Sequence, residues 1–265
     1  LRRAQAGLEE LAADTPPTVL EADVSPAQRE SLQRHLALKA RHFPEISGFR
    51  LIDREGGVRY ASEIPSPRAN ARERSYFEAL RQNPSLPLVF SEVAVGRMAG
   101  RQQMYIALPI RDARGGFAGV AMAPLELNYV QALFDAVDLG PGGVITFRRS
   151  DDGRLVLRRP AEPDRINKTL SNNPMHMRIE AGEREGIIRY EAAIDKVERV
   201  YAFKRVGNYP FYVAAGIATR DYLAHWRRNA IGTVGAATLF LCVLGGLLGR
   251  LHFTEVGRKR AARDL

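Results

Sequence analysis

Few residues in this sequence are of a type and spacing that could perform catalysis or bind a metal. His35 and His42 lie seven positions apart and could share a helix face, with Glu45 beyond them. Solvated helix residues explain this spacing better than a metal site, which needs a closed set of ligands. The only cysteine, Cys242, lies inside an apolar run, where it is unsuited to act as a nucleophile or a thiolate ligand. We therefore expect no catalytic residues, no metal site and no cofactor.

Two short motifs are similar to functional loops but are better explained as turns. The sequence GPGG at 140–143 lacks the Lys and the Ser or Thr of a phosphate-binding loop, and also the spacing of a dinucleotide fingerprint. The sequence SDDG at 150–153 holds two adjacent carboxylates, but backbone geometry alone favours Asp and Gly in hairpin turns. The sequence also has no Gly-x-Ser-x-Gly nucleophile elbow. A membrane-tethered enzyme is therefore only an alternative, which predicts turnover of a substrate by the isolated domain.

The C-terminal part of the chain contains twenty consecutive uncharged residues, 230–249. As a helix they extend about 30 Å, which is the thickness of the hydrocarbon core of a bilayer. We predict a transmembrane helix rather than a buried core helix, which would be shorter and would keep a polar face. Five basic residues follow this run and three lie shortly before it, so we expect residues 250–265 in the cytoplasm and residues 1–229 in the periplasm or outside the cell.

The ends and the charge of the chain give further expectations. The sequence begins with Leu1 rather than Met, so we expect a preceding transmembrane segment or signal peptide. The net charge of +9 is spread over 265 residues and is weak support for a nucleic-acid partner. We expect none.

Before the apolar run, the periodicity changes from helical to strand-like. Ser25 before Pro26 is typical of a helix N-terminus, and apolar residues then recur at helical spacing as far as Phe43. The more polar residues 1–14 are a candidate upstream helix. We therefore predict that residues 1–43 form a long N-terminal signalling helix.

Four hairpins follow, each with two short apolar runs around a turn rich in Gly or charged residues. Their turns are predicted at 54–57, 112–116, 150–153 and near Asp195. A helix, RERSYFEALRQN, and a strand, LPLVFSEVAV, separate the first two hairpins. A helix over the first part of ELNYVQALFDAVDLGPGG separates the second and third, and the strand FYVAAGI follows the fourth.

These elements predict two tandem units, each with an antiparallel sheet of five strands, and an α+β fold class. The predicted boundaries are 44–125 for the first unit and 126–218 for a linking helix with the second unit. Residues 219–249 would form a juxtamembrane and transmembrane helix, and residues 250–265 would begin a cytoplasmic linker.

The order of these elements, with RSYFEAL followed by a hairpin that ends in GGFAGVAMAPLEL, resembles the double Cache sensors of bacterial transmembrane receptors. The resemblance covers about residues 20–249 and implies two PAS-like units, of which the membrane-distal unit binds a small molecule. Receptors of this family carry diguanylate cyclases, histidine kinases or chemoreceptor domains as outputs. We expect a diguanylate cyclase first and a histidine kinase next, so that the enzymatic activity would belong to the cytoplasmic domain.

The resemblance also implies ligand-binding residues. By this resemblance, the ligand helix of the family corresponds to Arg74, Tyr76 and Phe77. These residue types suit the role, because a guanidinium binds a carboxylate bidentately and the rings wall the pocket. From the facing sheet, the candidates are Arg101, Tyr105 and Arg97.

One departure from the family pattern bears on the ligand. Cache domains that bind amino acids place an acidic residue where this chain has Ala123 or Pro124, and neither can hold an amine. Glu126 lies two positions beyond Pro124 and is an open alternative. We therefore expect a carboxylate or another anion that needs no amine.

Structural roles compete with these assignments. Arg74 could pair with Glu78 on an exposed helix face, and Tyr76, Phe77 and Leu80 could simply pack on the sheet. An anchor or assembly protein without a ligand is a third class. The expected partners are a small-molecule ligand, the membrane and a second copy of the chain in a homodimer. The dimer is expected because small residues spaced by four in the apolar run, Gly232 with Ala236 and Gly245 with Gly249, let two helices approach closely.

Overall fold

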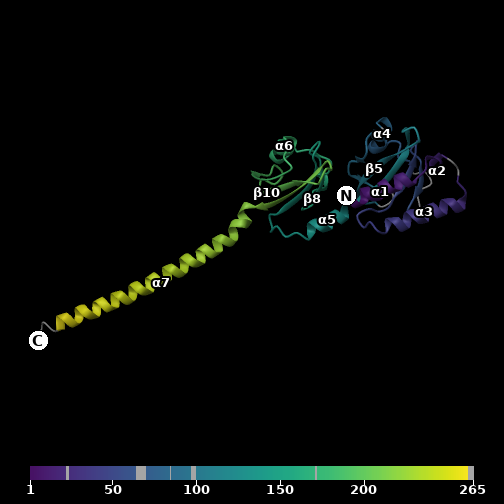
Figure 1. The fold of residues 1–265 in the computed structure, drawn as a ribbon. Helices are drawn as coiled ribbons and strands as arrows, with labels where there is room; N and C mark the ends of the chain where they lie inside the picture. The colour runs from purple at the N-terminus through teal and green to yellow at the C-terminus, as the bar shows by residue number, and fades with distance from the viewer. Residues whose placement is uncertain (22–23, 64–69, 84, 97–99, 171, 262–265) are drawn as a thin grey trace. The chain divides into compact units, whose positions relative to one another are not determined.

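The structure is a computed structural model that describes residues 1–21, 24–63, 70–83, 85–96, 100–170 and 172–261 (Figure 1). The chain divides into two compact units. The first consists of Leu1–Asp138, Val144–Gly186 and Phe203–Ala214, and the second of Leu139–Gly143, Ile187–Ala202 and Ala215–Leu265.

The predicted N-terminal helical region is present as three helices, α1 (Arg2–Asp14), α2 (Pro17–Glu21) and α3 (Pro26–Ala40). Thr15 caps the C-terminal end of α1 and is followed by Pro16 and Pro17, and a helix cannot continue through prolines because they lack an N–H donor. At the start of α3, the Ser25 hydroxyl accepts from the N–H of Gln28 at 3.3 Å. The Gln28 side chain accepts from the N–H of Ser25 at 3.1 Å. This reciprocal capping box explains why α3 begins where the sequence predicts.

The first sheet is antiparallel and has six strands in the order β2-β1-β6-β5-β3, with β4 also paired to β5. The strands are β1 (Arg50–Asp53), β2 (Val58–Ala61), β3 (Val89–Phe90), β4 (Ala94–Val95), β5 (Gln102–Arg111) and β6 (Phe117–Glu126). The predicted turns at 54–57 and 112–116 are confirmed. In the second turn, Asp112 Oδ1 accepts from the N–H groups of Arg114 and Gly116 at 2.9 and 2.8 Å, a local Asx arrangement that fixes the turn.

Helices cover the two faces of this sheet (Figure 1). Helix α4 (Ser75–Gln82) packs on β5 and β6, and α1 packs on the same two strands. One face carries Ile52, Tyr105, Ala107, Val120 and Met122, which form a core with Tyr76, Phe77 and Leu80 of α4.

The predicted single strand over LPLVFSEVAV, residues 86–95, is corrected to two short strands, β3 and β4, so the first sheet has six strands rather than five. The ladder changes at Ser91, whose hydroxyl replaces a backbone carbonyl as the acceptor for the N–H of Tyr105 at 2.9 Å. Side-chain hydrogen bonds of this kind compete with regular strand pairing.

The second sheet has the five antiparallel strands that the sequence predicts, in the order β8-β7-β11-β10-β9. Its strands are β7 (Val144–Arg149), β8 (Leu155–Arg159), β9 (Glu185–Glu191), β10 (Glu198–Arg205) and β11 (Phe211–Ala218). The helical segments of this region are α5 (Leu127–Asp135), the 3-10 turn η1 (Pro163–Arg165) and α6 (Pro174–Glu180). The predicted α+β class is therefore confirmed.

The last helix, α7 (Thr219–Ala261), begins where the sequence predicts and is 43 residues long. Within the described residues it is the one helix long and apolar enough to cross a membrane, over Asn229–Gly246. Within the residues of α7 whose burial is described, large apolar side chains are exposed, including Leu239, which is 67% exposed. Exposing these apolar side chains to water is unfavourable, whereas exposing them to the hydrocarbon core of a bilayer is not.

Candidate functional site

The N-terminus of α4 places the first three candidate residues. Arg74 is the residue before the helix, with an extended backbone at ψ 133°. Its carbonyl accepts from the N–H groups of Phe77 and Glu78 at 3.0 and 3.1 Å. The side chain of Arg74 is half-buried, while Tyr76 and Phe77 in the first turn are only 3% and 0% exposed. The helix therefore buries two aromatic rings against the sheet and leaves the guanidinium at the margin.

Arg74, Tyr76 and Tyr105 come together at this margin. The Tyr76 and Tyr105 ring centroids are 5.5 Å apart with an interplanar angle of 45°. The Arg74 guanidinium carbon lies 5.8 Å from the centroid of the Tyr105 ring, within the range of cation–π attraction. Tyr105 is 4% exposed. Three of the six candidates thus form one cluster of a cation and two buried rings.

Phe77 belongs to the core rather than to this margin. Its ring meets that of Phe117 edge to face, with centroids 5.6 Å apart, and the side chain is fully buried. The burial of Phe77 is explained by its packing between α4 and the sheet. This is the alternative role that the sequence analysis gave for Phe77.

The Tyr76 hydroxyl lies among two arginines and a second phenol. Burial raises the pKa of Tyr76 well above its usual range, and Tyr105 adds to the rise, while the positive charges of Arg74 and Arg50 act in the opposite direction. Arg50 is therefore part of the electrostatic environment of the site, although the sequence analysis did not select it.

Arg50 lies on β1, opposite Ala61 and Met122 in the neighbouring strands. Its Nε donates to the Glu63 carboxylate at 2.7 Å, and a second nitrogen contacts the same oxygen. The strand alternation of GFRLIDR, which puts Arg50 on the same face as Ile52, was the sequence signal that could have revealed it.

A second polar group lies two residues from Tyr105 on the same face. Gln103, which is 1% exposed, donates to the Ser47 hydroxyl at 3.2 Å and to Glu126 Oε1. The other oxygen, Glu126 Oε2, is buried and has no hydrogen-bond partner among the described residues. Pro124, the residue opposite Tyr105 on β6, offers no side-chain acceptor.

Of the two remaining candidates, the structure describes only Arg101. Arg101 is exposed one residue before β5, and no described contact links it to Arg74 or Tyr105. Arg97 lies outside the described residues. The alternative pairing of Arg74 with Glu78 is not observed, since Glu78 binds Arg81 at 2.9 Å and Gln82 at 2.7 Å.

The succession of two antiparallel sheets and an apolar helix is matched by a known family. A sequence profile of the Cache domain matches residues 1–226. The chain belongs to the Cache-domain family. As a Cache protein, it contains a ligand-binding sensor domain. A search of curated proteins found no match.

Solved domains of histidine kinases and chemoreceptors share this fold. The extracellular domain of rpHK1S-Z16, described as a histidine kinase, is 25% identical with a TM-score of 0.70, over 85% of this chain and 89% of that chain. The ligand-binding domain of the Pseudomonas aeruginosa PAO1 amino-acid chemoreceptor PctB, solved with L-Arg, is 19% identical with a TM-score of 0.62, over 89% and 90% of the two chains. That of its chemoreceptor PctC, solved with GABA, is 19% identical with a TM-score of 0.54, over 81% and 93%.

Proposed function

We propose that this Cache chain is the extracytoplasmic sensor region of a membrane receptor and binds a small carboxylate beside α4. The observation that carries the proposal is the Arg74 guanidinium, which is half-buried over Tyr105 and makes no ion pair with any described residue. A guanidinium at the margin of an aromatic core is partly desolvated, so a carboxylate that completes its hydrogen bonds gains more there than on an open surface.

The neighbouring arginine is less available for a ligand. The Arg50 guanidinium is bound to Glu63, and a ligand carboxylate would have to displace that partner. Arg74 has no such competitor in the described part of the chain. We therefore assign Arg74 the ligand carboxylate, and Tyr76 and Tyr105 the apolar wall beside it.

The relatives PctB and PctC are amino-acid chemoreceptors, which raises the question of an amine. This chain has Pro124 opposite Tyr105, and a proline cannot accept a hydrogen bond through its side chain. Glu126 Oε2 is an acceptor without a described partner and would serve a hydroxyl or amine on the ligand. The proposal is a carboxylate ligand for which such a donor group is optional.

The output is proposed on the basis of the relatives. Histidine kinases and chemoreceptors supply the solved domains named above, and these outputs fit better than the diguanylate cyclase expected from the sequence. In either case the ligand would shift the population of two sensor conformations by its difference in affinity for them. Helix α7 would carry that shift across the membrane within a homodimer, from the periplasm or cell exterior to the cytoplasm.

The test uses the 265-residue chain in lipid nanodiscs, with thermal unfolding followed by circular dichroism. Succinate, L-serine and GABA are the probes, because they separate a carboxylate alone from a carboxylate with an amine. A ligand that binds only the folded state raises its melting temperature, so we expect a rise with succinate that saturates with concentration. A melting temperature that none of the three probes changes would contradict the carboxylate assignment.

A further inference from the structure

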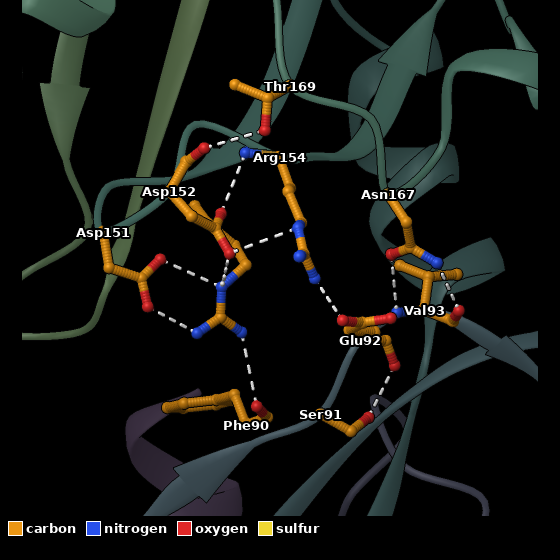
Figure 2. Close-up of polar contacts among 10 residues, drawn as sticks. Phe90, Ser91, Glu92, Val93, Asp151, Asp152, Arg154, Asn167 and Thr169 are labelled. Atoms are coloured by element: carbon orange, nitrogen blue, oxygen red, sulfur yellow. Dashed lines mark hydrogen bonds and ion pairs between the residues drawn. The ribbon is translucent and has the colours of Figure 1, made fainter. Parts of the chain in front are cut away.

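Residues 90–93, here called the edge segment, form part of the edge of the first sheet and are held on two sides. On one side they lie alongside β5 and bond to it. On the other side they contact residues from the β7–β8 hairpin and from the chain after η1. Figure 2 shows Arg154 directed toward Glu92 and Asn167 directed toward Val93. Residues of the second sheet region therefore fix a strand edge of the first sheet.

The edge segment is bonded directly to the candidate site. The N–H of Ser91 donates to the carbonyl of Tyr105 at 2.9 Å, and the N–H of Tyr105 donates to the Ser91 hydroxyl at 2.9 Å. That hydroxyl in turn donates to the carbonyl of Glu92 at 2.6 Å. Both backbone groups of Tyr105 thus depend on Ser91, and a shift of the edge segment must move the ring that lies beneath Arg74.

Asn167 binds the edge segment as a neighbouring strand would. Its Oδ1 accepts from the N–H of Val93 at 3.0 Å, and its Nδ2 donates to the carbonyl of Val93 at 2.7 Å. Only an amide side chain offers both an acceptor and a donor in this geometry. The backbone of Asn167 has φ 60°, a left-handed conformation that Asn tolerates better than most residues.

Two arginines complete the attachment. Arg154 pairs with Glu92, and its side chain is oriented by Asp152, whose Oδ2 lies 3.5 Å from Arg154 Nε. Arg149 donates to the carbonyl of Phe90 at 3.3 Å and is held by Asp151. The two carboxylates of the SDDG turn therefore position arginines.

The same segment also contacts the strand that leads to the membrane helix. The ring of Phe90 meets that of Phe211 edge to face, with centroids 4.8 Å apart. Phe211 is the first residue of β11, and α7 follows β11 directly in the chain. The edge segment thus lies between Tyr105 of the candidate site and the beginning of the strand that continues into α7.

We propose that Asn167 and Arg154 are positioning residues of the ligand site, which act on Tyr105 through Ser91 although neither touches the ligand. This inference rests on the proposed function for its meaning in sensing. Because coupling between two sites is reciprocal, a ligand that moves Tyr105 must also change the contacts of Asn167 and Arg154. We expect loss of these contacts to weaken ligand binding, because Ser91 then holds Tyr105 less firmly beneath Arg74.

The first test measures amide hydrogen exchange at Tyr105 and Ser91 in the full chain in nanodiscs, and it needs no ligand. Asn167→Gly preserves the φ 60° backbone without strain but removes both hydrogen bonds to Val93. Asn167→Asp keeps the acceptor and loses the donor. We expect exchange at Tyr105 to accelerate about tenfold in the first variant and less in the second. Arg189→Gln is the matched control, because it breaks an exposed ion pair with Glu198 elsewhere in the chain.

The second test titrates the same proteins with succinate by calorimetry. We expect binding about tenfold weaker in Asn167→Gly and about threefold weaker in Arg154→Gln, with the control unchanged. Exchange at Tyr105 equal to that of the unmodified chain would overturn the inference, and so would faster exchange with unchanged succinate affinity. If the unmodified chain fails to bind succinate, the proposed ligand class fails, while the exchange at Tyr105 still decides whether Asn167 positions it.

Discussion

The guanidinium of Arg74 lies over the ring of Tyr105, at 5.8 Å from its centroid. One residue precedes α4 and the other belongs to β5, so the contact joins the helix and sheet components of the candidate site. Because the two residues are far apart in the sequence, their contact depends on the packing of α4 on β5. This pairing supports the proposal that Arg74 binds the ligand, rather than Arg101, which is exposed one residue before β5.

Replacing Arg74 by Ala is expected to weaken succinate binding about tenfold to a hundredfold, because hydrogen bonds to charged groups contribute about 1.5–3 kcal/mol. Arg81→Ala on the same helix is the control, since Arg81 pairs with Glu78 at the surface. Isothermal titration calorimetry of both variants measures the effect. Equal succinate affinity in Arg74→Ala and the unmodified chain would remove Arg74 from the site.

Phe77→Ala is expected to lower the free energy of unfolding by about 3–5 kcal/mol, because the fully buried ring leaves a cavity between α4 and the sheet. Urea unfolding followed by circular dichroism gives this quantity. Arg81→Ala should change it by less than about 0.5 kcal/mol, as is usual at exposed positions. A small effect of Phe77→Ala would mean that the ring is not a core residue.

Tyr212 on β11 should make the free energy of unfolding decrease as the pH rises above about 10. Its side chain is 0% exposed, its hydroxyl has no hydrogen-bond partner in the described part of the chain, and burial raises its pKa to about 12. The unfolded chain releases this proton near pH 10, so the contribution of Tyr212 is complete below pH 10 and decreases as the pH rises toward 12.

Tyr212→Phe removes this ionisable proton. The free energy of unfolding of the variant should therefore decrease less steeply between pH 10 and pH 12 than that of the unmodified chain. At neutral pH the variant should be about as stable or slightly more stable, because an unpartnered buried hydroxyl is lost. Parallel slopes for the two proteins above pH 10 would show that Tyr212 ionises as freely in the folded state as in water.

Asn173→Ala is expected to cost about 1 kcal/mol of stability through loss of a helix cap. The Asn173 side chain accepts from the N–H groups of Met175 and His176 at 3.1 and 3.4 Å at the start of α6. Asn173→Asp retains the acceptor and should restore most of the loss. Chemical denaturation compares the three proteins, and equal losses in both variants would argue against capping.

Leu239→Arg should prevent stable insertion of α7, because an arginine near the centre of a transmembrane helix costs about 2.5–3.5 kcal/mol. Asn229→Arg, at the first residue of the candidate span, should insert normally since its charge can reach the interface. Alkaline extraction of membranes separates inserted from peripheral protein. Retention of both variants in the membrane pellet would contradict a single span over Asn229–Gly246.

Elements governed by neighbouring residues could be predicted from the sequence. The Asp112 turn is closed by bonds within the turn itself, and the start of α3 is set by Ser25 and Gln28. Interactions over a few residues are encoded in the local order of residue types. The apolar run in α7 is likewise visible in composition alone.

Elements decided by contacts between distant residues could not be predicted. The division of residues 86–95 into β3 and β4 depends on Ser91 binding Tyr105 and on Asn167 binding Val93. The contact of Phe77 with Phe117 likewise joins residues that are distant in the sequence.

The sequence by itself therefore determined the α+β class, the hairpins and the apolar helix, because periodicity and turn chemistry repeat over short distances. Only the tertiary structure decided which candidates meet, placing Tyr105 beneath Arg74 and Glu63 beside Arg50. Packing of α4 on β5 brings Arg74 to Tyr105, and pairing of β1 with β2 brings Glu63 to Arg50. Both depend on burial of a whole sheet face rather than on any one segment.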